Sequence, residues 1–199
     1  MRRQTRLRGF TLIELLIVVA IIAILALIAV PNFLEAQVRA KVSRCRADMR
    51  SLATALEAYA VDNNAYPYSM EGDWPPDLPR YSPYMGLTHL TSPIAYIASV
   101  PQDPFMSGSP ARMNDTWTHG GFHYWLKEVR LKWAVFEGWG PDAWIWIVGV
   151  ENAGKEWAML SYGPDMYLNW ELKPDERQST QYDPTNGTVS FGDIFRVGP

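Results

Sequence analysis

The sequence has little cysteine, little histidine and no excess of positive charge. One cysteine in 199 residues, Cys45, excludes an intramolecular disulfide and a metal site built from several thiolates. A formal net charge of −3 argues against nucleic-acid binding, because proteins that bind nucleic acid neutralise phosphates with an excess of Lys and Arg. Hydrophobic residues at 48% and charged residues at 20% are close to globular averages, which excludes a disordered or fibrous chain.

Motifs of catalytic sites are also missing. His119 and His123 are four residues apart, but Gly120 and Gly121 between them would break the helix that could align two zinc ligands. The sequence contains no Gly-x-Ser-x-Gly, no phosphate-binding loop and no dinucleotide-binding fingerprint. We therefore predict that the protein is not an enzyme.

What the sequence does have is a strong asymmetry at its N-terminal end. Residues 1–9 contain four arginines and no acid, and residues 10–30 contain a single charged residue, Glu14. The second stretch has about the 20 residues that a helix needs to cross a bilayer. A basic stretch before an apolar run is typical of a secretory targeting segment, but no small-residue cleavage site follows. We predict that the apolar segment stays on the protein as a membrane anchor.

Positive charges flank this segment on both sides, so the positive-inside rule alone does not fix its orientation. The downstream cations are Arg39, Lys41, Arg44, Arg46 and Arg50. They lie farther from the apolar run than the leader arginines do, and Asp48 lies among them. We therefore expect the leader to lie inside the cell and the body of the chain to lie on the other side of the membrane.

Glu14 is anomalous, because a carboxylate within a membrane span costs roughly 2.5–3.5 kcal/mol. One interpretation is that it lies near the end of the span and reaches the headgroups. The other requires cleavage between Gly9 and Phe10. The new α-amino group of Phe10 could then neutralise Glu14, within one chain or between chains.

The run Gly9-Phe10-Thr11-Leu12-Ile13-Glu14, followed by Leu, Ile, Val and Ala, closely resembles the class III signal of type IV pilins and type II secretion pseudopilins. The resemblance implies that a prepilin peptidase cuts after Gly9 and methylates Phe10. It implies that Glu14 pairs with the terminal amine of a neighbouring subunit, and that Pro31 matches the helix-kinking proline of the family. Residues 1–9 would then be a leader peptide and residues 10–30 a transmembrane and assembly helix.

Beyond Pro31, apolar residues recur every three or four positions and form one stripe of an amphipathic helix. The members of the stripe are Leu34, Val38, Val42, Cys45, Met49, Leu52, Leu56 and Tyr59. The pattern predicts a helix from about Phe10 to Val61, ended by Asp62-Asn63-Asn64 and Pro67, with residues 31–64 as its amphipathic half. Cys45 is predicted to be a small buried core residue.

Residues 65–199 are predicted to form a periplasmic body with long loops. Nine of the fifteen prolines fall between Tyr66 and Pro110, which predicts mostly loop with a short helix around Ile94–Ser99. Strands are predicted at Phe122–Lys127, Leu131–Phe136, Trp144–Val150, Trp157–Tyr162 and Thr188–Val197. The fold class is therefore α+β: one long N-terminal helix packed on an antiparallel sheet of three to five strands. The nine tryptophans are interpreted mainly as core and loop anchors, with a carbohydrate- or partner-binding surface as the alternative.

Two segments of the body resemble major pseudopilins. Val100–Phe105 matches a Pro-x-Asp-Pro-aromatic turn, and Ser161–Asp165 matches the Ser-x-Gly-x-Asp segment that opens a calcium-binding loop. The resemblance implies a calcium site. Asp165 within the segment would supply one oxygen ligand, and three residues downstream would supply others: Asp175, Asp183 and Asn186. A long insertion, Met166–Pro184, departs from the family pattern, and the same acids could equally be turn formers.

The resemblance implies a structural subunit of a pseudopilus-like filament in a type II secretion-like system. Such a subunit would be held in the bacterial inner membrane with its body in the periplasm. Its partners would be copies of itself, other pseudopilins, the prepilin peptidase and the inner-membrane assembly platform. Two alternatives stay open: a type IV pilin of a surface fibre for adhesion, motility or DNA uptake, and a membrane-anchored binding domain that does not polymerise.

Overall fold

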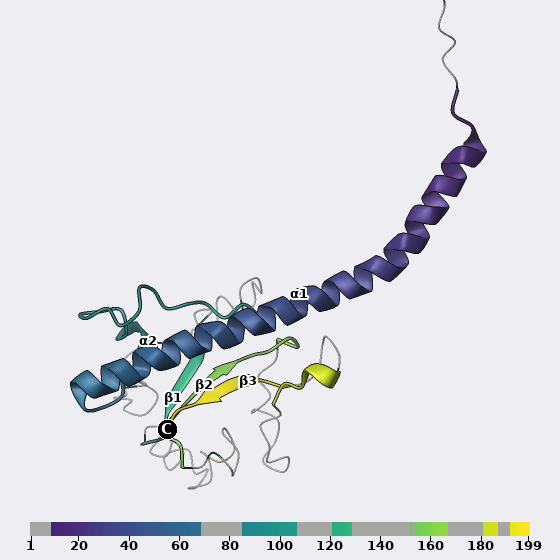
Figure 1. The fold of residues 1–199 in the computed structure, drawn as a ribbon. Coiled ribbons are helices and arrows are strands. Elements are labelled where there is room, and N and C mark those ends of the chain that lie inside the picture. The colour runs from purple at the N-terminus through teal and green to yellow at the C-terminus, as the bar shows by residue number, and fades with distance from the viewer. Residues whose placement is uncertain are drawn as a thin grey trace, which may run out of the picture. The chain divides into compact units, whose positions relative to one another are not determined.

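The computed structural model describes residues 9–68, 85–106, 121–128, 152, 154–166, 181–186 and 192–199 (Figure 1). The contacts divide the chain into two units, one ending at Gln37 and the other beginning at Val38. The elements follow in the order α1 (Leu12–Asn63), α2 (Met85–Thr88), β1 (His123–Leu126), β2 (Trp157–Ser161), the 3-10 helix η3 (Pro184–Asn186) and β3 (Ile194–Val197).

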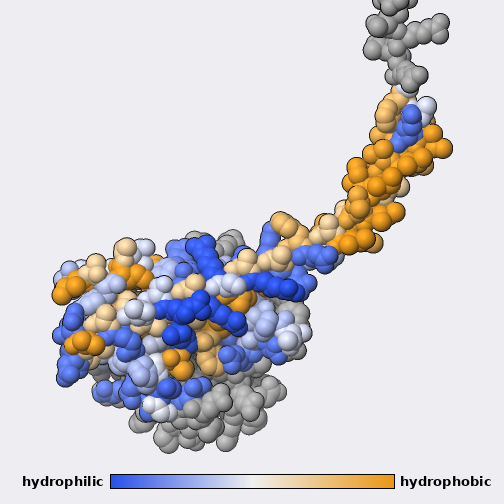
Figure 2. All heavy atoms as spheres, in the orientation of Figure 1, coloured by the Kyte–Doolittle hydropathy of each residue, from blue (hydrophilic) through white to orange (hydrophobic). Residues whose placement is uncertain are grey.

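The first unit consists of the apolar part of α1. This part is long and apolar enough to cross a membrane, and no residue of its most apolar stretch is buried (Figure 2). Pro31 lies inside the helix. Because proline has no N–H, the hydrogen bond to the carbonyl of Leu27 is missing and the helix can bend there.

The second half of α1 belongs to the other unit and supplies one wall of the core. The predicted stripe is confirmed, with its central residues buried and its ends half-buried at Val38 and Tyr59, whereas Leu34 is exposed. The buried residues of α1 are Val42, Cys45, Met49, Leu52, Ala53, Ala55 and Leu56. The helix ends as predicted: Asn64, with a φ of 53°, takes the left-handed conformation that terminates helices.

Three antiparallel strands in the order β1-β2-β3 form the sheet among the described residues, and the second half of α1 lies across it (Figure 1). Successive side chains of a strand point to opposite faces. Tyr124, Trp157 and Met159 pack with the buried stripe of α1, whereas Trp125 and Leu160 belong to a second buried cluster. Both faces of the sheet are therefore buried.

The predictions at Phe122–Lys127, Trp157–Tyr162 and Thr188–Val197 are confirmed by β1, β2 and β3, although residues 187–191 lie outside the described part of the chain. Leu131–Phe136 and Trp144–Val150 also lie outside it.

The helix predicted around Ile94–Ser99 is wrong, because this segment is a series of bends. The N–H groups of Tyr96 and Ile97 both donate to the carbonyl of Leu90, which turns the chain back on itself. The Tyr96 ring packs edge-on against Tyr59 of α1. These contacts replace the hydrogen bonds of a helical turn.

Candidate functional site

Gly9 and Phe10, the predicted site of cleavage and methylation, lie exposed immediately before α1. A Cβ added to Gly9 would meet no atom within 4 Å, and 72% of the Phe10 surface is exposed. Nothing within the described chain therefore requires a glycine at position 9. A requirement for glycine there would come from a molecule that binds this segment.

Thr11 and Glu14 form a capping box at the start of α1. The Glu14 carboxylate accepts hydrogen bonds from the main-chain N–H and the hydroxyl of Thr11, at 2.9 and 2.6 Å. The Glu14 N–H donates to the Thr11 hydroxyl at 3.3 Å. Glu14 thus has a partner inside its own chain, which our sequence analysis missed. The signal was present, because Thr-x-x-Glu before an apolar run is the sequence pattern of a capping box.

A continuous apolar surface follows the capping box. The large hydrophobic side chains from Leu12 to Leu34 are all exposed, each by at least 45% of its surface. Burying such a surface is worth roughly 25 cal/mol per Å². An exposed apolar surface of this size is typical of a segment that lipid or other protein chains cover.

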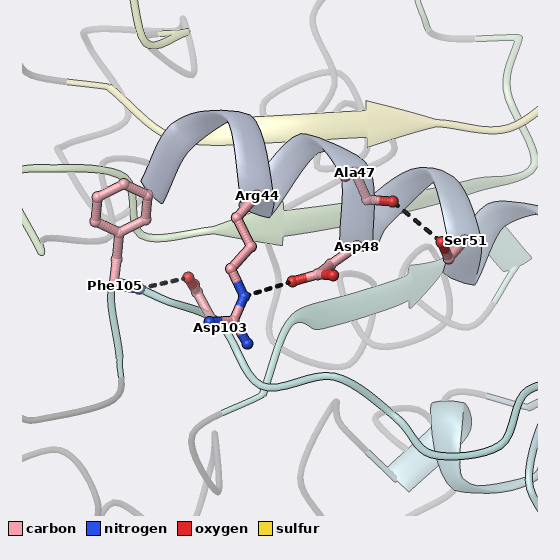
Figure 3. A network of polar contacts seen from close by, with 6 residues as sticks. All are labelled: Arg44, Ala47, Asp48, Ser51, Asp103 and Phe105. Atoms are coloured by element: carbon pink, nitrogen blue, oxygen red, sulfur yellow. Dashed lines mark hydrogen bonds and ion pairs between the residues drawn. The ribbon is translucent and has the colours of Figure 1, made fainter. Parts of the chain in front are cut away.

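The Pro-x-Asp-Pro-aromatic segment forms a turn that is tied to the end of β2. The Asp103 carboxylate accepts the N–H of Phe105 at 2.9 Å and the N–H of Tyr162 at 3.2 Å, and it also bonds to the Ser161 hydroxyl. Arg44 and Asp48 of α1 lie beside this turn (Figure 3). The turn therefore bonds to the end of β2, and its Phe105 belongs to the same buried cluster as the stripe of α1. The sequence analysis identified this segment only by its resemblance to a family pattern and did not predict these contacts.

Burial governs the protonation of this polar cluster. Asp103 has no exposed surface, and burial raises the pKa of its carboxyl to about 6, against the opposing effect of its hydrogen bonds. Burial likewise raises the pKa of the Cys45 thiol to about 12, so this cysteine is an unreactive core residue as predicted.

The Ser161–Asp165 segment turns tightly against the chain that precedes β3. Gly163 has a φ of +66°, and a Cβ there would clash with the carbonyl oxygen of Gly192. The hydroxyl of Ser161 accepts the N–H of Gly163 at 3.4 Å. Glycine at position 163 is therefore required both by the backbone conformation and by the approach of Gly192.

The structure describes three of the four predicted calcium ligands, and Asp175 lies outside the described residues. Asp165 is half-buried at the end of the tight turn, whereas Asp183 is exposed and accepts the N–H and hydroxyl of Thr185 at 2.8 and 2.7 Å. Asn186 is the last residue of η3. Within the described ranges, no three Cys, His, Asp or Glu side chains gather as a metal site. The bonds of Asp183 are those of a turn former, and the calcium site stays a prediction.

Two further residues of the polar interior were not anticipated. Glu57 of α1 accepts the Tyr66 hydroxyl at 3.0 Å and the Trp157 indole N–H at 3.1 Å, which ties the helix to β2. His123 is buried, and its Nε2 lies 3.1 Å from the Tyr162 hydroxyl. Burial lowers the pKa of His123 to about 3, so the ring is neutral. No sequence pattern distinguishes these residues from surface ones.

Gly9, Phe10 and the exposed apolar helix that follows them belong to a known sequence motif. Residues 5–30 match the family model of the prokaryotic N-terminal methylation motif. Residues 32–124 match a second model, that of type II secretion system (T2SS) protein G.

Known relatives agree with the two models. The chain is 36% identical over 113 residues to type II secretion system core protein G of Klebsiella michiganensis, a match covering 53% of this chain and 72% of the relative. It is 33% identical over 123 residues to core protein G of Pectobacterium carotovorum, over 58% and 71% of the two chains. The chain belongs to the protein G family of type II secretion systems. The comparison with solved structures found no match.

A type IV pilin also matches over a shorter length. The type IV major pilin protein PilA of Myxococcus xanthus is 49% identical over 65 residues, which is 33% of this chain and 30% of the pilin.

Proposed function

We propose that the protein is a structural subunit of a pseudopilus-like filament in a type II secretion-like system, and that it is not an enzyme. The observation that carries this proposal is the exposed apolar half of α1, opened by Gly9, Phe10 and the capping box of Thr11 and Glu14. Such a helix is stable in a lipid bilayer. Its apolar surface can also pack in a bundle of identical helices, and a filament subunit needs both environments in turn.

The proposed steps of processing, membrane insertion and assembly follow from this helix. A prepilin peptidase removes residues 1–9 and methylates Phe10, while residues 10–30 hold the subunit in the inner membrane. Residues 31–64 and the body, residues 65–199, face the periplasm. Copies of the subunit then leave the membrane together with other pseudopilins, through the assembly platform, as residues 10–30 pack against one another.

Processing is tested by intact-mass measurement of protein extracted from membranes of a bacterium that has the peptidase. The expected chain begins at Phe10 and has lost four arginines, so its formal net charge falls from −3 to −7. Gly9→Leu is the matched control. Because position 9 has open space around it, this variant should fold normally and keep the leader. A wild-type mass that retains residues 1–9 would contradict the proposal.

Filament formation is tested in a strain that lacks its own protein G but keeps the rest of its type II secretion system. Wild-type protein should restore export of the secreted substrate and give sheared filaments, and Gly9→Leu should do neither. The alternative function, a type IV pilin, is favoured by the match to the Myxococcus xanthus pilin. It would be indicated by surface fibres that form only with type IV pilus assembly genes.

A further inference from the structure

Positive charge is concentrated in one short stretch of α1. Five cations lie within twelve residues, together with a single acid, Asp48; we call this the basic stretch, and its cations are Arg39, Lys41, Arg44, Arg46 and Arg50. All five side chains are exposed, and Figure 2 shows strongly hydrophilic side chains along this part of the helix. The chain as a whole has 18 cations against 21 acids, so this cluster stands out from its surroundings.

The cations lie in two rows on opposite flanks of the helix, on either side of the ridge that faces away from the buried stripe. At 3.6 residues per turn, Arg39, Arg46 and Arg50 fall on one flank and Lys41 and Arg44 on the other. The ridge between the rows carries small exposed residues, namely Ala36, Ala40, Ser43, Ala47 and Ser51. Because the side chains of the ridge are short, the long cationic side chains on both flanks can extend past the ridge toward a surface that faces it. Two rows of long cations beside a low ridge suit a flat surface of negative groups.

We propose that the basic stretch binds the headgroups of anionic phospholipids while the subunit waits in the membrane. The apolar run ends at Val30, so Arg39 follows after about 13 Å of helix. The headgroup region is roughly 5–8 Å deep on each side of the hydrocarbon, and its field extends about 8–10 Å farther. Pro31 lets the helix bend between the two parts. Clusters of four to eight cations on a helix next to a span are the known pattern of binding to anionic lipid.

The position of the basic stretch gives a second argument. In the proposed topology these cations cross the membrane, against the tendency of positive charge to remain on the cytoplasmic side. Arg44 pairs with Asp48 at 3.6 Å, yet 73% of its side chain stays exposed. Attraction to lipid phosphates would offset part of the cost of placing these cations on the far side of the membrane. The inference rests on the membrane insertion contained in the proposed function.

The test measures how close α1 comes to the bilayer surface. The full chain extracted from membranes carries Ser43→Cys, labelled with a fluorescent donor, and is reconstituted into vesicles containing a headgroup-labelled acceptor lipid. Cys45 is buried, so the added cysteine reacts selectively. One set of vesicles is phosphatidylcholine alone, and the other also contains phosphatidylglycerol. We expect more energy transfer with phosphatidylglycerol. Raising NaCl from about 0.1 M to about 1 M, which shortens the screening length from about 10 Å to about 3 Å, should abolish the difference.

Two triple variants that remove the same number of cations distinguish an effect of the basic stretch from an effect of the net charge of the protein. Lys41→Gln/Arg46→Gln/Arg50→Gln should weaken the surface-bound state, by on the order of 100-fold if all three cations lie near the surface. Lys127→Gln/Lys155→Gln/Arg196→Gln removes three cations from the body and should leave energy transfer unchanged.

Equal energy transfer in both kinds of vesicle overturns the inference, as does an equal effect of the two triple variants. A signal that rises with the number of subunits per vesicle, without regard to lipid, would show that the basic stretch binds a second copy of the chain and would also overturn it. Flotation of the vesicles distinguishes the two proposals. A chain that does not float contradicts the proposed function itself, whereas a floating chain with no lipid dependence contradicts only this inference.

Discussion

The Asp103 carboxylate accepts a hydrogen bond from the main-chain N–H of Tyr162 at 3.2 Å, although 59 positions separate the two residues. One oxygen of Asp103 holds its own turn through Phe105 and the other holds the residue that follows β2. A single buried side chain thus fixes the loop before β1 to the tight turn beginning at Ser161. This relationship explains why the turn needs an acid at this position and not merely a turn-forming residue.

Asp103→Asn should destabilise the body by about 1–3 kcal/mol, because an amide NH₂ replaces one acceptor oxygen and leaves a buried N–H unpaired. Denaturant unfolding of a fragment beginning at Asn32 measures this change. Asp183→Asn is the matched control, since Asp183 is exposed and bonds to Thr185, two residues along the chain. Equal small losses for the two variants would contradict the proposed role of Asp103.

A comparison of wild type with Asp103→Asn also tests the pKa of Asp103. Because the folded-state pKa is raised to about 6 from 3.8, the contribution of this group to stability is fully present below about pH 3.8 and is lost as pH rises through about 6. The pKa of His123 is lowered, so its contribution to the stability of the protein changes in the opposite direction and is lost as pH falls below 6.5. His123 is present in both proteins and cancels in the difference. The stability of wild type relative to Asp103→Asn should therefore increase from pH 7 to pH 4, and a constant difference would contradict the raised pKa.

Gly163→Ala should destabilise the body by about 1–3 kcal/mol or more, since alanine is strained at a φ of +66° and its Cβ would meet the Gly192 carbonyl. Gly154→Ala is the control, because a Cβ there meets nothing within 4 Å. Thermal unfolding of the two variants, read against wild type, decides the matter. Comparable melting temperatures for both would show that the turn adapts easily.

The sequence was enough to predict the parts of the fold that depend on periodic patterns. The stripe from Val38 to Tyr59 defined the buried face of α1, and Asn64 ended the helix where the polar run Asp62-Asn63-Asn64 indicated. The runs of aromatic and other apolar residues around Tyr124 and Met159 became paired strands. These features are local, because the spacing of apolar residues determines which face is buried.

The contacts that could not be predicted are those between distant segments. Nothing in the sequence pairs Asp103 with Tyr162, or Glu57 with Trp157, because the residue types alone fit exposed positions equally well. The error at Ile94–Ser99 has the same origin, since the bonds to Leu90 and the packing of Tyr96 on Tyr59 come from tertiary structure. The capping box of Thr11 and Glu14 is different: it is local and could have been recognised.

Calcium should raise the melting temperature of the Asn32 fragment if Asp165 contributes to a site, because a ligand that binds only the folded state stabilises it. Asp165→Ala should remove the rise. Glu156→Ala, which removes the same charge from an exposed position, should retain it. No calcium-dependent shift in wild type would leave Asp165, Asp175, Asp183 and Asn186 as turn residues.

The last prediction concerns Glu14, for which the structure offers a cap and the family resemblance offers a partner amine. Three variants separate the two roles. Glu14→Gln keeps the capping box, which Gln also closes, but removes the charge. Thr11→Val removes the hydroxyl of the cap but keeps the carboxylate. Glu14→Leu removes the carboxylate, and with it both the charge and the bonds that the carboxylate accepts from Thr11. All three leave Gly9 and Phe10 in place, and leucine makes the span more apolar, so processing and membrane insertion should continue.

If Glu14 pairs with the Phe10 amine of a neighbouring subunit, Glu14→Gln and Glu14→Leu should both give processed, membrane-bound protein without sheared filaments. An unpaired buried charge costs several kcal/mol, and this cost recurs at every subunit of the polymer. Thr11→Val should still assemble, because losing a cap costs only about 0.5–2 kcal/mol within one helix. Normal filaments from Glu14→Gln, together with failure of Thr11→Val, would reverse the assignment. The carboxylate would then act as a helix cap, and assembly would not depend on its charge.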